Sequence, residues 1–168
     1  GKAPPLTADA FSLRRSGRPF PVTGTTYMAS DVHRQFLLEP NPIVWDRDFA
    51  EMKAAGVNLV RTGIWTGWKL YMSEVGRAYE AALRALDVFL LTARHYDIPV
   101  IFNLFAFLPE AWGGQNPFLD GRSVKAQQAC AGIFAQRYAR ANDLVWDLIT
   151  EPSFSSPAQL WKTRPNGD

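Results

Sequence analysis

"IPVIFNLFAF", residues 98–107, is the stretch that decides the fold. Asn103 is its one polar residue, so the stretch lacks the alternation of a strand that faces water on one side. A strand that is apolar on both faces is typical of a parallel sheet whose faces are both covered. We therefore expect a central parallel strand here, with Asn103 as a buried amide that needs hydrogen-bond partners.

The segments around this strand have the periodicity of amphipathic helices. A first helix over 43–56 is indicated by Trp45, Phe49 and Met52, and Gly56 ends it. The longest pattern precedes the strand, and a third follows it. These two patterns comprise Tyr79, Ala82, Leu83, Leu86, Phe89, Leu90 and Ala93, and then Cys130, Ile133, Phe134, Tyr138 and Ala141.

Further strands are predicted over 21–28 ("PVTGTTYM"), 57–65 ("VNLVRTGIW", ending near Arg61) and 143–150 ("DLVWDLIT"). Residues 11–20 ("FSLRRSGRPF") predict a hairpin that turns at Ser16-Gly17. The predicted order is a hairpin followed by β-α-β-α-β-α-β. Such alternation implies a parallel α/β sheet with right-handed crossovers.

Two α/β folds have this order, the doubly wound sheet and the (β/α)8 TIM barrel. No G-x-G-x-x-G phosphate turn supports the first. The connections after the helices are short, as in "AAGVN", "HYDIP" and "ARAND", whereas those after the strands are long and aromatic, which favours the barrel. A barrel takes about 250 residues, so we expect only about its first four βα units here. The expected domains are an N-terminal extension with a hairpin, 1–20, and the first half of a barrel catalytic domain, 21–168, which continues beyond the chain.

Three stretches, "GVNLVR", "IPVIFNLF" and "LVWDLITEPS", lie at the predicted strands. Together they resemble the retaining (β/α)8 glycoside hydrolases of the cellulase, mannanase and β-galactosidase clan, over roughly residues 18–155. The fourth strand of those enzymes ends in Asn-Glu-Pro, whose Glu is the general acid/base. The resemblance gives that role to Glu151, within Thr150-Glu151-Pro152. Arg61 matches an arginine that ends their second strand, and Asp147 matches an acidic residue on the fourth.

One position departs from that pattern. The family's asparagine, which contacts the sugar 2-hydroxyl, is Thr150 here. A hydroxyl makes one hydrogen bond where an amide makes paired contacts, so the departure bears on sugar preference and efficiency rather than on the acid role.

Glycoside hydrolysis needs a second carboxylate besides the acid. Asp147 lies four residues before Glu151 on one strand, about 13 Å away, whereas a retaining pair is separated by about 5 to 5.5 Å. The resemblance places the nucleophile on the seventh strand, outside this chain. The structural alternatives for Glu151 are a helix cap or an ion pair with Arg61.

The expected substrate-binding residues lie at strand ends and in the loops that follow: Arg61, Trp65, Trp68, Asn103, Trp112 and Thr150. Arg61 needs a carboxylate partner, because an unpaired cation at a buried strand end is costly. For the tryptophans the alternative is packing within the loops. Tyr27 and His33 are further candidates, and His95, at a helix end, is expected to be structural.

Composition excludes several classes of function. A net charge of +2 does not favour nucleic acid or an anionic membrane. Two histidines and the single Cys130 are not at ligand spacing, so we expect no metal and no cofactor, and an internal disulfide is excluded. No secretory signal is visible, yet a trimmed form would lack one, and a secreted or periplasmic location is slightly favoured over the cytoplasm.

Three hypotheses follow. The first is a glycosidase that cleaves β-linked glycans or glycosides. The second is a non-catalytic carbohydrate-binding or scaffolding barrel derived from such an enzyme, and Thr150 favours it. The third is an unrelated small α/β domain. In the first two, a carbohydrate is the ligand, and the remaining barrel half or a covering partner is expected over the exposed sheet edges.

Overall fold

The computed structural model describes residues 4–106, 118 and 120–150 of the chain. Its central element is a four-stranded parallel sheet in the order β4-β5-β8-β9. The strands are β4 (Gly24–Thr26), β5 (Leu59–Gly63), β8 (Val100–Phe105) and β9 (Leu144–Ile149). The helices that connect them are α1 (Pro42–Ala54), α2 (Glu80–His95) and α3 (Gly121–Arg137). The predicted parallel α/β sheet is confirmed.

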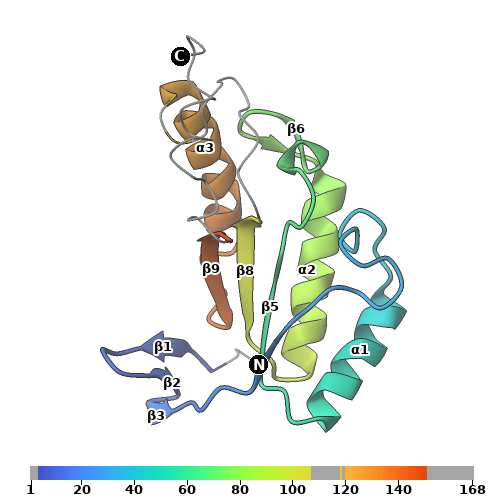
Figure 1. Ribbon diagram of the computed structural model, residues 1–168, viewed down its shortest axis with the longest axis vertical. Coiled ribbons are helices and arrows are strands. Elements are labelled where there is room, and N and C mark those ends of the chain that lie inside the picture. Colours follow the sequence, from blue (N-terminus) through green and yellow to red (C-terminus); the bar gives the residue numbers. More distant parts are fainter. Residues whose placement is uncertain (1–3, 107–117, 119, 151–168) are drawn as a thin grey trace, which may run out of the picture.

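The strands are neighbours in the same order as in the sequence, and Figure 1 shows α1 and α2 side by side along one flank of the sheet. A doubly wound sheet reverses its strand order at a switch point, whereas a barrel adds each strand beside the previous one. The observed order is therefore the order found in a barrel.

The two faces of the sheet differ in chemistry, because successive side chains point to opposite faces. Phe102 on β8 contacts the rings of Phe134 on α3 and Trp146 on β9, so these residues lie on the helix-covered face. Arg61, Asn103 and Asp147 have the opposite parity and lie on the other face.

Phe89, at the centre of α2, organises the core. Its fully buried ring contacts four aromatic rings from the first strand-to-helix connection and α1. They belong to Tyr27, Phe36, Trp45 and Phe49. The predicted apolar faces of α1 and α2 are confirmed there, but Tyr79 is an exception. It is the N-cap residue of α2 and is half-exposed, because the helix begins one residue later than the pattern suggests.

A small antiparallel sheet precedes the main one: β1 (Leu6–Ala8), β2 (Leu13–Arg15) and β3 (Arg18–Pro19). The predicted hairpin at Ser16-Gly17 is confirmed, with φ values of 52° and 75°, as a two-residue primed turn requires. The strand β1 was not predicted.

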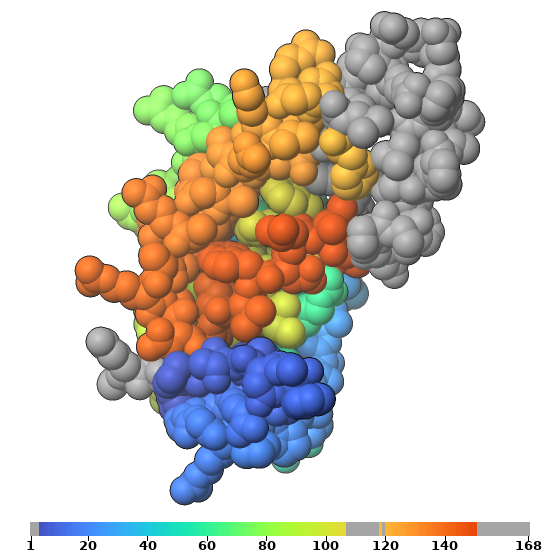
Figure 2. Space-filling view, turned by 90° about the vertical axis from the view of Figure 1, so that its left-hand side faces the viewer, coloured from blue at the N-terminus to red at the C-terminus, as the bar shows by residue number. Residues whose placement is uncertain are grey.

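This sheet lies against the amino-terminal ends of the parallel strands. The amide of Leu6 donates to the carbonyl of Asn142 at 2.9 Å, and Arg15 donates to Asp97. Both acceptors lie in the turns that lead into parallel strands, Asp97 before β8 and Asn142 before β9, and Figure 2 shows the small sheet (blue) directly below β9. The carboxyl ends of the strands, where Arg61 and Thr150 lie, are therefore at the opposite end of the sheet.

The long connection between β5 and α2 holds a 3-10 turn (Trp68–Leu70) and a short hairpin of β6 (Met72–Glu74) and β7 (Arg77–Ala78), none of which was predicted. Strands of two or three residues are too short to show a period of two, so the pattern could not reveal them. Within the described ranges, no strand pairs with the outer edge of β4 or of β9.

Candidate active site

Arg61, in the middle of β5, reaches Asp147 within β9 and Thr150 at its end, on the helix-free face of the sheet. Its Nε and Nη2 both donate to Oδ2 of Asp147, at 2.9 and 2.6 Å, and Nη2 also donates to Oγ1 of Thr150 at 2.6 Å. Arg61 and Asp147 expose 30% and 26% of their side chains, so the pair is neither free in water nor deeply buried. The predicted need of Arg61 for a carboxylate is confirmed, and Asp147 meets it.

Strand register explains how residues far apart in the sequence meet here. Asn103 on β8 is paired with Gly63 on β5 and with Asp147 on β9. Arg61 lies two residues before Gly63 and points to the same face. Its long side chain therefore crosses β8 to reach Asp147, and the ion pair holds β5 and β9 together over the strand between them.

Asn103 lies in the middle of this arrangement. Its side chain is fully buried, and neither its amide nitrogen nor its oxygen has a hydrogen-bond partner among the described residues. Gly63 makes room for it, since a Cβ at that position would lie 2.3 Å from the carbonyl oxygen of Asn103 and 2.7 Å from its Cβ. A buried amide without partners is expensive, so Asn103 remains a candidate for a ligand contact.

Trp65 and Trp68 are both buried, with 7% and 3% of their surface exposed. Trp65 donates from Nε1 to the carbonyl oxygen of Tyr27 and to Oγ1 of Thr62, both at 3.2 Å. Trp68 packs edge-to-face against Phe105. Neither ring presents a broad open face, and a role in sugar stacking stays a prediction.

The three remaining candidates, Tyr27, His33 and His95, lie in different environments, one buried and two at turns or helix ends. Tyr27 is a core residue whose hydroxyl donates to Oδ2 of buried Asp48 at 3.0 Å. Burial and the Asp48 charge raise the pKa of Tyr27, so the phenol stays protonated. His33 is exposed in a tight turn with φ 52°. His95 is the last residue of α2, in accord with a structural role.

Glu151 and Trp112, the predicted acid/base and one predicted binding residue, lie outside the described residues. The structure does place Thr150, whose amide donates to the carbonyl of Phe105 at 3.1 Å. The chain therefore still runs beside β8 at the residue before Glu151. The contact between Thr150 and Arg61 could not be predicted from the sequence, because it depends on the register of three strands.

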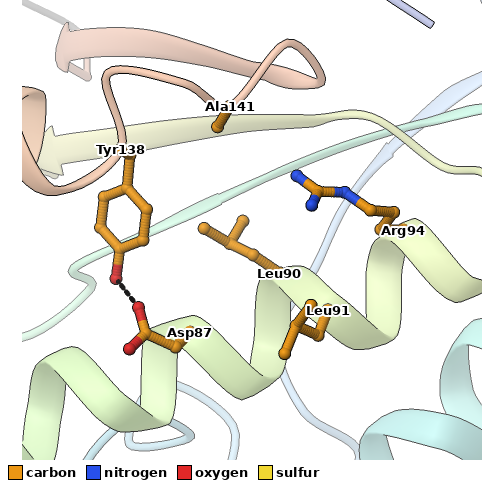
Figure 3. A pocket seen from close by; sticks show the side chains of 6 residues that line it. All are labelled: Asp87, Leu90, Leu91, Arg94, Tyr138 and Ala141. Atoms are coloured by element: carbon orange, nitrogen blue, oxygen red, sulfur yellow. Dashed lines mark hydrogen bonds between the residues drawn. The ribbon is translucent and has the colours of Figure 1, made fainter. Parts of the chain in front are cut away.

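A depression lined by Gly24, Thr25, Thr26, Leu59 and Arg61, of about 260 Å³, lies on the sheet itself. A larger cavity, of about 360 Å³, lies between α2 and the turn that follows α3 (Figure 3). The polar groups of the larger cavity already have partners: Asp87 accepts from Tyr138 and Arg137, and Arg94 donates twice to Asp143. The larger of the two cavities is therefore not the better candidate for the reactive site.

Other kinds of site receive no support from the described part of the chain. It holds no group of three or more His, Cys, Asp or Glu residues placed to bind a metal ion. None of its helices combines the length and apolarity needed to cross a membrane.

No family model matches the chain, and no curated protein matches it. Solved structures do. The exo-β-1,4-mannosidase Op5Man5 from Opitutaceae bacterium strain TAV5 matches with a TM-score of 0.74 at 20% identity, over 94% of this chain and 30% of that enzyme. An endo-1,4-β-mannanase from Rhizomucor miehei matches with a TM-score of 0.66 at 16% identity, over 88% of this chain and 48% of that enzyme. The β-mannanase of the blue mussel Mytilus edulis matches with a TM-score of 0.64 at 17% identity, over 89% and 46%.

The chain thus spans less than half the length of these three enzymes. At such low identity the similarity shows the fold: the parallel α/β arrangement is one that these glycosidases contain.

Proposed function

We propose that the chain is the first half of a (β/α)8 barrel that hydrolyses β-linked glycosides with retention of configuration. The observation that supports this most is the contact of Arg61 with Asp147 and Thr150, which reaches the carboxyl end of β9 directly before Glu151. In barrels of this type the functional residues lie at that end. The fold shared with mannosidases and mannanases makes β-mannosides the first substrates to test.

In the proposed mechanism Glu151 is the general acid/base. It gives its proton to the glycosidic oxygen while the bond from that oxygen to the anomeric carbon breaks, and a second carboxylate attacks the anomeric carbon. Glu151, now ionised, then takes a proton from the water that releases the sugar. The second carboxylate belongs to the remaining βα units, so the 168-residue chain alone is expected to be inactive.

Asn103, Thr150 and Trp112 are proposed to contact the sugar. The oxygen of Thr150 accepts a hydrogen bond from Arg61, which leaves the hydroxyl proton free to donate. Thr150 would thus offer a sugar oxygen one donor, in place of the two-sided contact of an asparagine.

A non-catalytic carbohydrate-binding barrel is the second candidate. Thr150 favours it, since the position departs from the Asn-Glu-Pro pattern of active enzymes.

The deciding experiment compares the longer polypeptide that carries this chain with its Glu151→Gln variant on aryl β-mannosides and β-glucosides. Loss of about 100-fold or more in kcat is expected of an acid/base residue. Glu74→Gln, a matched change on the exposed β6–β7 hairpin, is the control and should retain full activity. Binding without hydrolysis in the unmodified protein would favour the second candidate.

A further inference from the structure

The Arg61 guanidinium has a second neighbour besides its hydrogen-bond partners. Its central carbon lies over the ring of Trp65, 5.5 Å from the centroid. A guanidinium is attracted to the face of an indole, because the ring carries a negative potential there. Arg61 therefore has two kinds of neighbour, the oxygen atoms that accept its hydrogen bonds and the aromatic ring over which it lies.

The indole itself is fixed in place. Its Nε1 donates to the carbonyl oxygen of Tyr27 and to Oγ1 of Thr62, and that hydroxyl donates to the same carbonyl at 3.0 Å. The amide of Tyr27 in turn donates to the carbonyl of Arg61 at 2.8 Å. These bonds attach Trp65 to the pair of strands that carries Arg61. They therefore fix the position of the indole relative to the guanidinium.

The burial of Trp65 argues against a role in stacking on a sugar ring. A stacking platform must offer one open ring face, yet Trp65 exposes only 7% of its surface and already carries the arginine. Its polar atom is also occupied within the protein. These observations favour a role toward Arg61 over a role toward a ligand.

We infer that Trp65 is a positioning residue: it holds the Arg61 guanidinium in the plane from which it bonds Asp147 and Thr150, and so fixes the strand end that precedes Glu151. This inference rests on the proposed function for its catalytic consequence, but not for its geometry. Without the indole, Arg61 keeps its anion but gains rotational freedom, and the hydroxyl of Thr150 loses a fixed partner.

The geometry is tested by NMR of arginine Nε–H groups in the longer polypeptide that carries this chain, with the Arg61 signal identified by its loss in Arg61→Lys. We expect a signal shifted upfield by the indole ring and slow to exchange with water. Trp65→Leu should abolish the upfield shift and speed exchange at least about tenfold, while Trp65→Phe retains part of the shift. Trp45→Leu, an equal truncation in the core between α1 and α2, should leave the signal unchanged.

An unshifted Arg61 signal in the unmodified chain would overturn the inference, even if Trp65→Leu failed to fold. So would a signal that Trp65→Leu leaves in place.

The catalytic consequence is tested in the longer polypeptide. Trp65→Leu should lower kcat about tenfold and change KM less than about twofold, with partial rescue by Trp65→Phe. A rise in KM at constant kcat would instead show that Trp65 binds sugar, against the inference. If the unmodified polypeptide hydrolyses nothing, the proposed function fails, and the NMR result still decides the role of Trp65.

Discussion

Arg61 lies in a strand whose neighbouring residues, Val60 and Thr62, are fully buried. A cation in such a place is tolerated only with an anion beside it, because desolvation is otherwise uncompensated. A carboxylate partner for Arg61 was therefore predictable from the sequence. Its identity as Asp147 was not, because it depends on β9 lying two strands away in the sheet.

Asp147→Asn should therefore destabilise the protein, by about 1 to 3 kcal/mol, since it leaves a partly buried guanidinium without its anion. Urea unfolding of the variant and the unmodified chain measures the difference. Glu74→Gln breaks an exposed ion pair with Arg77 and should cost no more than about 0.5 kcal/mol. Equal effects of the two changes would show that the Arg61–Asp147 pair contributes no more than a surface pair.

The ion pair of Asp143 with Arg94 should make the stability of the protein depend on pH. Burial is the largest single influence on Asp143 and acts to raise its pKa. The hydrogen bonds and charge of Arg94, with smaller contributions from a backbone hydrogen bond and the charge of Arg15, together outweigh burial, so the pKa is lowered overall. As the pH falls, the unfolded chain takes up this proton first, so stability from Asp143 is fully present above about pH 5 and is lost as the pH falls through the lower pKa of the folded state.

The free energy of unfolding between pH 7 and pH 2.5 should therefore fall less steeply in Asp143→Asn than in the unmodified chain. Glu74→Gln again serves as the surface reference. Parallel curves for Asp143→Asn and the unmodified chain would contradict the assignment.

The strands β5 and β8 approach each other closely at one point. A Cβ on Gly63 would meet the backbone oxygen of Asn103 at 2.3 Å, which no side-chain movement can relieve. The glycine is thus required by the contact between two elements, and it lies in register with Asp147 and two residues after Arg61.

Gly63→Ala should cost more than about 2 kcal/mol, because the sheet must shift to accept the methyl group. Gly132→Ala is the matched control: a Cβ there meets nothing within 4 Å, and the residue lies within α3. Alanine should stabilise that helix by about 0.5 to 1 kcal/mol. Thermal unfolding of both variants, with shifts of opposite sign, checks the prediction.

Long elements were predictable and short ones were not. The patterns of Trp45 with Phe49, and of Leu83, Leu86 and Phe89, extend over several turns and indicated α1 and α2 correctly. The strands β1, β6 and β7 have two or three residues, fewer than a pattern needs.

The candidate site was predictable residue by residue but not as an arrangement. The sequence indicated Arg61, Asn103 and Thr150 individually. It could not show that Thr150 accepts from Arg61, or that Trp65 lies under the guanidinium, since both contacts follow from register and side-chain direction.

At the scale of the whole molecule, the sheet is open at both edges within the described chain. Leu148 on β9 exposes 59% of its surface, and β4 is exposed along its length. Unpaired strand edges bind other strands, which agrees with the proposal that further βα units close the barrel.

The isolated 168-residue chain should therefore self-associate. Sedimentation should give species heavier than the 18.8 kDa monomer, increasingly so at higher concentration. Leu148→Lys places a charge on the exposed edge and should shift the distribution toward the monomer without loss of secondary structure. A purely monomeric chain at high concentration would argue that the sheet edges need no cover.

The proposal as a whole depends on a proton that leaves Glu151 for the departing oxygen of a sugar. The most direct test measures kcat/KM of the longer polypeptide and its Glu151→Gln variant on two β-mannosides, one with a 2,4-dinitrophenolate leaving group and one with an alkyl alcohol. An acidic leaving group needs little protonation, so the variant should keep most of its activity on the first substrate and lose nearly all on the second. Equal losses on both, or none on either, would contradict the role of Glu151.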